Sequence, residues 1–310
     1  MIDQIRGLHH VTSLAGDAQQ NNDFFTKTLG LRRVKKTVNF DAPDVYHLYY
    51  GDAQGTPGSV MTYFPFPGIV KGTPGAGEVG ETQFSVPTGS LGYWENRLHE
   101  HGVEGLKRGE SFGSERLSFQ GPDGDGFALV ERDNDTRPVW DAGGPDADVA
   151  IRGFLGVRMR LMDDGATSEL LQFMGYEKAE EHRNQVRFAA RNGNGADFVD
   201  LEILPDAKAS RQGAGSVHHV AFAVEDRAAQ LEVRKALSDT GYQVTPVIDR
   251  DYFWAIYFRS PGGVLFEVAT NEPGFDRDED PAHLGESLRI PTQHEAIRDR
   301  IEASLPPIND

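Results

Sequence analysis

The chain has 310 residues, enough for two domains with separate apolar cores, and it lacks cysteine, which excludes disulfides, thiolate metal sites and a cysteine nucleophile. Acidic residues outnumber Lys and Arg by 48 to 31, and the net charge of −17 argues against a nucleic-acid partner, because phosphate binding needs clustered cations. The N-terminus shows no basic stretch followed by an apolar core, and no run approaches the roughly 20 apolar residues that a bilayer needs, so we expect a cytoplasmic protein with no membrane partner.

One order of signals, a strand, a helix and then three strands, occurs four times along the chain. In the first copy we predict a strand at 8–14 and a helix at 17–29 that ends at Gly30. Three further strands of that copy are predicted at 33–39, 45–50 and 59–64, with turn residues between them.

The other three copies repeat this order with different spacings. The second copy has a strand at 80–86, a helix at 91–101 and strands near 103, at 116–120 and at 127–131. The third copy has a strand at 153–159, a helix at 168–174 and a last strand at 197–204. The fourth copy begins at 217, has a helix at 227–240, and continues with strands at 243–248, 253–259 and 264–269.

A polar stretch rich in Pro and Gly, residues 133–146, separates the second copy from the third and is typical of a domain boundary. We therefore predict an α+β fold of four βαβββ modules in two domains, 1–140 and 148–310. After residue 269 an acidic segment and a helical tail near 293–303 look like an appendage, to which we assign no chemistry.

Two histidine pairs mark the first strands of copies one and four: His9-His10 and His218-His219. Glu267 lies in the last strand of copy four. Two imidazoles and one carboxylate are the donor set of non-haem Fe(II) oxygenases. Since successive side chains of a strand face opposite sides, simple alternation lets one member of each pair enter a shared cavity, and spacing alone does not say which.

Copies two and three serve as an internal comparison. Where copies one and four carry His-His, copy two has Gln83-Phe84 and copy three has Leu155-Gly156, while Glu202 occupies the place of Glu267. A carboxylate without imidazoles is a poor transition-metal site, so we expect a single metal centre made by copies one and four. We assign no function to the other histidines: His47, His99, His101, His182, His283 and His294.

Together these features resemble the vicinal oxygen chelate superfamily, which is glyoxalase/bleomycin resistance/extradiol dioxygenase-like in fold. More narrowly they resemble its ring-cleaving dioxygenases of the hydroquinone type, such as the 2,6-dichlorohydroquinone 1,2-dioxygenases. The similar segments span nearly the whole chain and include residues 7–12, 23–25, 45–50, 55–58, 134–137, 217–219 and 261–267.

The resemblance implies that the second histidine of each pair is the ligand, so that His10, His219 and Glu267 hold Fe(II), with Mn(II) as an alternative ion. It also implies catalytic roles for His218, Arg250 and Tyr257, and substrate binding by His9 and Thr12. The implied substrates are a small aromatic diol, such as a hydroquinone, and O2. The bulky pair Phe253-Trp254 departs from the pattern and is expected to reshape the pocket.

Two other functions compete with this interpretation. A glyoxalase-type isomerase on the same scaffold would need a fourth ligand, a carboxylate on the last strand of the partner module, and residues 59–64 contain no acid. A metal-free protein that binds an aromatic compound would need no histidine-carboxylate set. For either class, a homo-oligomer such as a dimer is a common default.

The acidic charge is spread along the whole chain, and of the 31 cations only eight are Lys, so 23 are Arg. High ionic strength would screen the self-repulsion of such a chain. We therefore expect a halophilic protein, kept soluble in concentrated salt.

Overall fold

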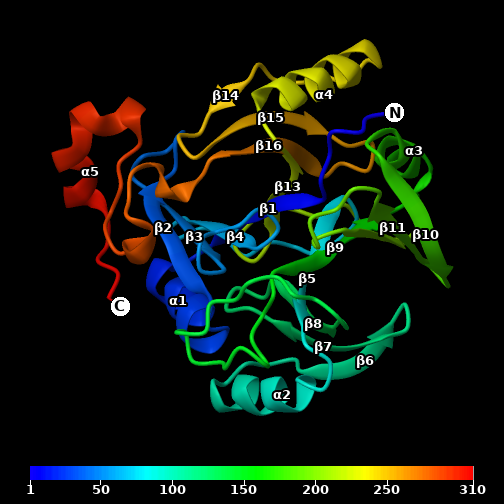
Figure 1. The fold of residues 1–310 in the computed structure, drawn as a ribbon, viewed down its shortest axis with the longest axis horizontal. Coiled ribbons are helices and arrows are strands. Elements are labelled where there is room, and N and C mark those ends of the chain that lie inside the picture. Colours follow the sequence, from blue (N-terminus) through cyan, green and yellow to red (C-terminus); the bar gives the residue numbers. More distant parts are fainter. Residues whose placement is uncertain (310) are drawn as a thin grey trace.

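The computed structural model describes residues 1–309 and contains two curved eight-stranded sheets with helices packed on them (Figure 1). Module 1 consists of β1 (Leu8–Ala15), α1 (Ala18–Asp23), the π-helical turn η1 (Phe24–Thr28), β2 (Arg32–Val38), β3 (Tyr46–Gly51) and β4 (Val60–Pro65). Module 4 consists of β13 (Val217–Val224), α4 (Arg227–Asp239), β14 (Ile248–Asp249), β15 (Phe253–Arg259) and β16 (Leu265–Pro273).

The two middle modules follow the same order. Module 2 consists of β5 (Glu78–Val86), α2 (Leu91–Glu100), β6 (Lys107–Ser111), β7 (Ser114–Gln120) and β8 (Gly126–Glu131). Module 3 consists of β9 (Phe154–Leu161), α3 (Gly165–Phe173), β10 (Tyr176–His182), β11 (Gln185–Ala190) and β12 (Phe198–Ile203). The prediction of an α+β fold with four βαβββ modules is confirmed.

Modules pair through their first strands. β1 runs antiparallel to β13, which joins modules 1 and 4 in the strand order β14-β15-β16-β13-β1-β4-β3-β2. β5 runs antiparallel to β9, which joins modules 2 and 3 in the order β10-β11-β12-β9-β5-β8-β7-β6. Each sheet therefore draws on both halves of the chain, and the domain boundary between residues 140 and 148 stays a prediction.

The structure differs from the predicted elements in three modules. In module 2 the strand expected near 103 begins only at Lys107, and in module 3 the strands β10 and β11 were not predicted. The third difference lies in module 4. The strand expected at 243–248 shrinks to the two residues of β14, because Pro246 has no N–H to donate to a ladder with β15. The two first strands β1 and β13 lie at the centre of their sheet and are buried almost throughout. This central position places both histidine pairs in the interior.

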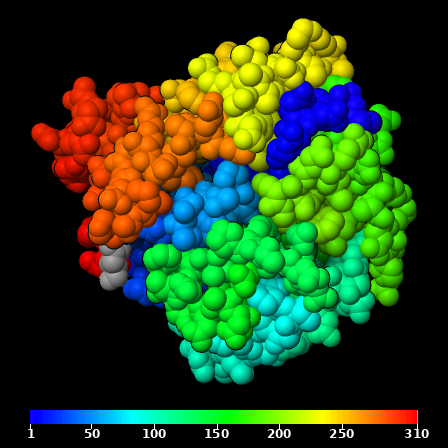
Figure 2. Space-filling model, viewed as in Figure 1, coloured from blue at the N-terminus to red at the C-terminus, as the bar shows by residue number. Residues whose placement is uncertain are grey.

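The C-terminal appendage has little regular structure. It contains the short helices η2 (Phe275–Arg277), η3 (Pro281–His283), η4 (Thr292–Ile297) and α5 (Arg298–Ser304). In Figure 2 its orange and red residues cover one end of the molecule beside the blue residues of module 1. None of the helices within residues 1–309 is long and apolar enough to cross a lipid bilayer.

Candidate metal centre

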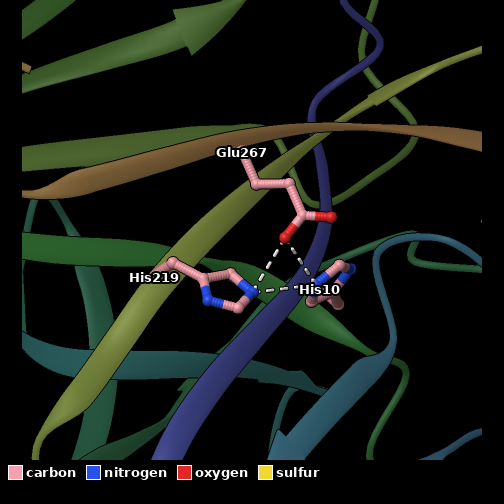
Figure 3. A group of neighbouring side chains, drawn as sticks. All are labelled: His10, His219 and Glu267. Atoms are coloured by element: carbon pink, nitrogen blue, oxygen red, sulfur yellow. Dashed lines mark hydrogen bonds and ion pairs between the residues drawn. The ribbon is translucent and has the colours of Figure 1, made fainter. Parts of the chain in front are cut away.

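Three buried side chains from three adjacent strands converge at the middle of the first sheet (Figure 3). Nε2 of His10 on β1 lies 3.3 Å from Nε2 of His219 on β13 and 3.4 Å from Oε2 of Glu267 on β16. Nε2 of His219 lies 2.9 Å from that same oxygen. The structure thus brings together the three donor atoms expected from the sequence.

A pair of β-bulges aims the histidines. Between β1 and β13 the register runs from His10 opposite Ala221 to Thr12 opposite His219, and it shifts on either side of that stretch. The shifts leave His9 and His218 without a partner residue in the ladder. A bulge lets two consecutive side chains turn to the same side of a strand, which simple alternation forbids. Both members of each pair therefore reach the metal-centre region.

The first histidine of each pair supports the second. Nδ1 of His9 lies 2.9 Å from Nδ1 of His10, and Nδ1 of His218 lies 2.8 Å from Nδ1 of His219. Burial and the neighbouring His10 lower the pKa of His9 to about 3, so its ring is neutral. Nε2 of His9 must donate to the carbonyl of Thr270, 3.1 Å away, because a carbonyl only accepts.

This network assigns the tautomers. With a proton on Nε2, His9 accepts at Nδ1 from Nδ1–H of His10, so that Nε2 of a neutral His10 carries a lone pair. That lone pair faces Nε2 of His219 and the carboxylate of Glu267. A second hydrogen bond behind a ligating imidazole is the usual support of a metal-binding histidine.

Glu267 lacks the partners that a buried carboxylate normally has. Its side chain is fully buried, and neither oxygen accepts a hydrogen bond of good geometry, although Nε2 of His219 lies close by. Burial raises the pKa of Glu267, but positive charge on the neighbouring His10 and His219 rings outweighs burial and holds that pKa well below its usual range. A divalent cation would supply that positive charge and could bind the carboxylate and both Nε2 atoms at once, so the residues fit a metal ion.

A cavity of about 370 Å³ opens beside these three residues, a size in the range of small-molecule sites. Its wall is mostly aromatic and apolar. The lining residues are His10, Leu14, Asn39, Phe40, Asp41, Ala42, His47, Tyr49, Phe64, Phe66, His218, His219, Arg250, Phe253, Tyr257, Leu265 and Glu267.

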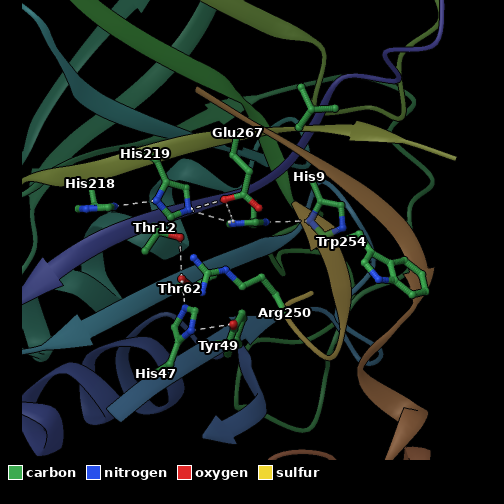
Figure 4. Close-up of polar contacts among 12 residues, drawn as sticks. His9, Thr12, His47, Tyr49, Thr62, His218, His219, Arg250, Trp254 and Glu267 are labelled. Atoms are coloured by element: carbon green, nitrogen blue, oxygen red, sulfur yellow. Dashed lines mark hydrogen bonds and ion pairs between the residues drawn. The ribbon is translucent and has the colours of Figure 1, made fainter. Parts of the chain in front are cut away.

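Arg250 and Tyr257 of module 4 both line this cavity, and Arg250 is seen in Figure 4. Nη2 of Arg250 lies 3.2 Å from Oδ2 of Asp41, a residue of module 1. Burial lowers the pKa of Arg250, but Tyr257 and Asp41 raise it further, so the guanidinium stays charged. Burial and the nearby Glu267 raise the pKa of Tyr257 well above its usual value, so its hydroxyl stays protonated and able to donate.

Two other predicted site residues, Thr12 and His9, lie behind the residues that line the cavity. Thr12 is fully buried, and its hydroxyl lies 2.9 Å from that of Thr62 on β4. Neither Thr12 nor His9 lines the cavity. Of the bulky pair, Phe253 lines the cavity and packs on the rings of His9 and His10, whereas Trp254 lies under Arg227 away from it.

Sequence reasoning missed His47. Its Nε2 lies 2.8 Å from Oγ1 of Thr62 and its Nδ1 lies 2.7 Å from the hydroxyl of Tyr49, and both His47 and Tyr49 line the cavity. Burial and the nearby His10 lower the pKa of His47 well below its usual value, so the ring is neutral. The alternation within β3, which turns His47 and Tyr49 to one face, is the signal that could have revealed it.

The second sheet carries ion pairs where the first carries the metal-centre residues. Register shifts between β5 and β9 place Glu81 at the position of His10, and Gly156 at that of His219. In the neighbouring ladder Arg158 lies opposite Asp200, as Ala221 lies opposite Glu267 in the first sheet. Asp200, and not Glu202, is therefore the counterpart of Glu267, because Arg158 is the counterpart of Ala221 and lies opposite Asp200.

These acids already have cationic partners. Arg187 donates two hydrogen bonds to Asp200, of 2.7 and 2.8 Å, and Glu81 pairs with Arg116 and Arg158. Guanidinium groups thus neutralise the carboxylates of the second sheet. Among residues 1–309 only His10, His219 and Glu267 form a cluster suited to a metal ion.

Known proteins share this architecture over the whole chain. A family model described as the Glyoxalase/Bleomycin resistance protein/Dioxygenase superfamily matches residues 153–268. The protein named "Putative ring-cleaving dioxygenase MhqO" from Bacillus subtilis (strain 168) is 41% identical, over 99% of this chain and 98% of its own length. The chain belongs to the ring-cleaving dioxygenases of this superfamily. The resemblance seen in the sequence is confirmed.

Two further members of this dioxygenase family support the assignment. The chlorohydroquinone/hydroquinone 1,2-dioxygenase of Sphingobium indicum is 36% identical, over 96% of this chain and 95% of its own length. The crystal structure of a "putative dioxygenase" from Bacillus subtilis subsp. subtilis str. 168 has a TM-score of 0.95 at 40% identity and covers 99% of this chain and 98% of its own.

Proposed function

We propose that this chain is an Fe(II)-dependent, extradiol-type dioxygenase that cleaves the ring of a hydroquinone or related diol with O2. One observation carries the proposal: the donor atoms of His10, His219 and Glu267 converge at the wall of an aromatic-lined cavity. The relative that acts on chlorohydroquinone and hydroquinone supports the substrate class. Mn(II) suits the same donors and is the alternative ion.

His10, His219 and Glu267 would hold the ion through one nitrogen each and one carboxylate oxygen. A bound ferrous ion supplies Lewis-acid stabilisation of an ionised ring oxygen and a path for electrons from the ring to O2. Three protein donors leave room for both reactants. His9 would act behind His10, since its hydrogen bond to Thr270 keeps the ligand nitrogen free of a proton.

The charged and polar groups of the cavity would orient the diol. Arg250 offers a permanent positive charge that favours a phenolate over a phenol. Tyr257 offers a neutral O–H that would donate to a ring oxygen. Burial and the neighbouring His219 lower the pKa of His218 to about 4, so it enters the reaction neutral. With its Nδ1 accepting from Nδ1–H of His219, its Nε2–H would donate to an oxygen in the cavity. Thr12 would act through Thr62 and not by touching the substrate.

An isomerase of the glyoxalase type is the competing function. It would need a fourth ligand, a carboxylate, on β4. At the position of β4 that corresponds to Glu267 of β16, this chain has Thr62. A metal-free role in binding aromatic compounds would not need two histidines and a glutamate to converge in the buried wall of the cavity. Both observations favour the dioxygenase.

Oxygen uptake tests the proposal. Protein purified without oxygen and loaded with Fe(II) is expected to consume one O2 per ring with members of a panel of para- and ortho-diols. The Glu267→Gln variant is the inactive control. If wild-type protein consumes no diol but isomerises a thiol-aldehyde adduct, the dioxygenase proposal is wrong.

A cytoplasmic location and a homo-oligomeric state stay predictions. Cell fractionation tests the location, and size-exclusion chromatography with light scattering tests the oligomeric state.

A further inference from the structure

The C-terminal appendage reaches the mouth of the metal-centre cavity. After β16 the chain passes along the outer edge of β2, where Leu288 forms a bridge with Lys36, and then continues into η4 (Figure 1). At the start of η4 three consecutive residues contact two different loops: Thr292 contacts Asp251, and Gln293 and His294 contact the carbonyl of Phe40.

Both loops carry cavity walls. The loop between β2 and β3 supplies Phe40 and Asp41, and the turn between β14 and β15 supplies Arg250. β2 and β14 are the two edge strands of the curved sheet, so its ends meet here. The ion pair between Arg250 and Asp41 spans this junction, and the Arg250 guanidinium lies 5.4 Å from the centre of the Phe40 ring. Figure 4 shows the Arg250 side chain directed toward the cluster of histidines and Glu267.

The Arg250 turn has a strained backbone that the appendage supports. Asp251 adopts φ +62°, in the left-handed region that residues other than glycine seldom occupy. Its carboxylate accepts hydrogen bonds from the backbone N–H and the hydroxyl of Thr292, of 2.8 and 3.0 Å. Its carbonyl accepts from Nη1 of Arg277 at 2.5 Å. A strained backbone of this kind persists only where surrounding contacts hold it in place. Here the contacts come from two residues of the appendage, Thr292 and Arg277.

We propose that the segment Phe275–Ile297 is a clasp that fixes Arg250 and Phe40 in the cavity wall, with Asp251 and Thr292 as positioning residues. Its effect on substrate rests on the proposed function, whereas its effect on the two loops does not. Without the clasp, the turn relaxes, the guanidinium leaves its place over the cavity, and the diol loses its charged partner. The chemistry at the metal, which depends on residues of β1, β13 and β16, changes less than substrate binding.

Two variants and a control test the clasp in the full-length protein. Thr292→Val removes one hydroxyl donor, and Asp251→Ala removes the acceptor and places a strained φ on a residue that cannot compensate for it. Asp251→Asn is the conservative rescue, because asparagine tolerates the left-handed region and keeps an acceptor oxygen. Glu295→Gln is the matched control, since the exposed carboxylate of Glu295 bonds only to Arg298 among the described residues.

Hydrogen exchange of residues 39–45 and 249–253 is the first readout. We expect faster exchange of both segments in Thr292→Val and Asp251→Ala, and rates close to wild type in Asp251→Asn and Glu295→Gln. The second readout is the KM for the best diol found, expected to rise about ten-fold in Thr292→Val with kcat within about two-fold, the pattern of lost ground-state binding.

Exchange rates equal to wild type in both segments of Thr292→Val and Asp251→Ala would overturn the clasp. Exchange that rises while KM stays constant would overturn its role in positioning Arg250. If the wild-type enzyme turns over no diol, the proposed function fails, but the exchange measurement still decides whether the appendage holds the two loops.

Discussion

Thr62 holds in module 1 the register position that Glu267 holds in module 4. Thr62 lies beside Thr12, two residues after the metal-centre histidine of β1, and Glu267 lies beside Ala221, two residues after that of β13. On the other side, Tyr49 pairs with Thr62 as Tyr257 pairs with Glu267. The site is thus a pseudo-twofold arrangement with a carboxylate on one side and a neutral hydroxyl, bonded to His47, on the other.

We predict that Thr62→Glu converts the centre into a four-ligand site. A second carboxylate at the equivalent position would raise metal retention on the order of ten-fold, while occupying a place that the reactants need. Oxygen uptake should fall by about 100-fold or more. Chelator competition measures retention, and an oxygen electrode measures uptake.

The control for this experiment is Thr62→Val, which removes the hydroxyl without adding a ligand. It should leave metal retention at the wild-type level. Metal retention in folded Thr62→Glu protein that does not exceed that of Thr62→Val would contradict the pseudo-twofold interpretation of the site.

Glu267→Gln and Asp200→Asn change equivalent positions in the two sheets and should have opposite consequences. The first removes the negative charge of the proposed ligand and should lower bound metal by roughly ten-fold or more, with oxygen uptake lost. The second leaves Arg187 buried without its bidentate partner and should cost about 3 kcal/mol of unfolding free energy. Its metal content should stay near one ion per chain, as elemental analysis would show. Loss of metal in Asp200→Asn would contradict the assignment of a single centre in the first sheet.

The sequence predicted the four modules, and it singled out two histidine pairs and Glu267 as candidate donors, because both depend on local patterns: a repeated order of elements, and histidines within apolar strands. The residue pattern left open which histidine of each pair points toward Glu267, because that depends on bulges set by the pairing of β1 with β13, which are far apart in the chain. The same holds for Asp200, which only the register of β9 and β12 identifies. Nothing in the sequence placed the appendage near the cavity, because no local pattern indicates its contacts with loops that are distant in sequence.

We expect the melting temperature to rise with salt. The acidic side chains, with a net charge of −17, repel one another in dilute buffer, and salt screens this repulsion. The melting temperature should therefore rise by roughly 5 °C or more between dilute and molar KCl. KCl is preferred to sulfate, because sulfate also strengthens apolar burial. Calorimetry at several KCl concentrations is the measurement. A melting temperature that does not change over this range would argue against a halophilic origin.

Asp125 should make the protein less stable at neutral than at acid pH. It is buried in the loop before β8, accepts a hydrogen bond from Tyr63, and burial raises its pKa to about 6. The folded state therefore binds this proton more tightly than the unfolded state, whose pKa is near 3.8. The contribution to stability is fully present below pH 3.8 and is lost as the pH rises through about 6, a difference of about 3 kcal/mol. Asparagine carries no charge at either pH. Urea unfolding at pH 4.5 and 7.5 should therefore show that Asp125→Asn gains stability relative to wild type only at the higher pH. An equal difference at both pH values would show that Asp125 does not titrate between them.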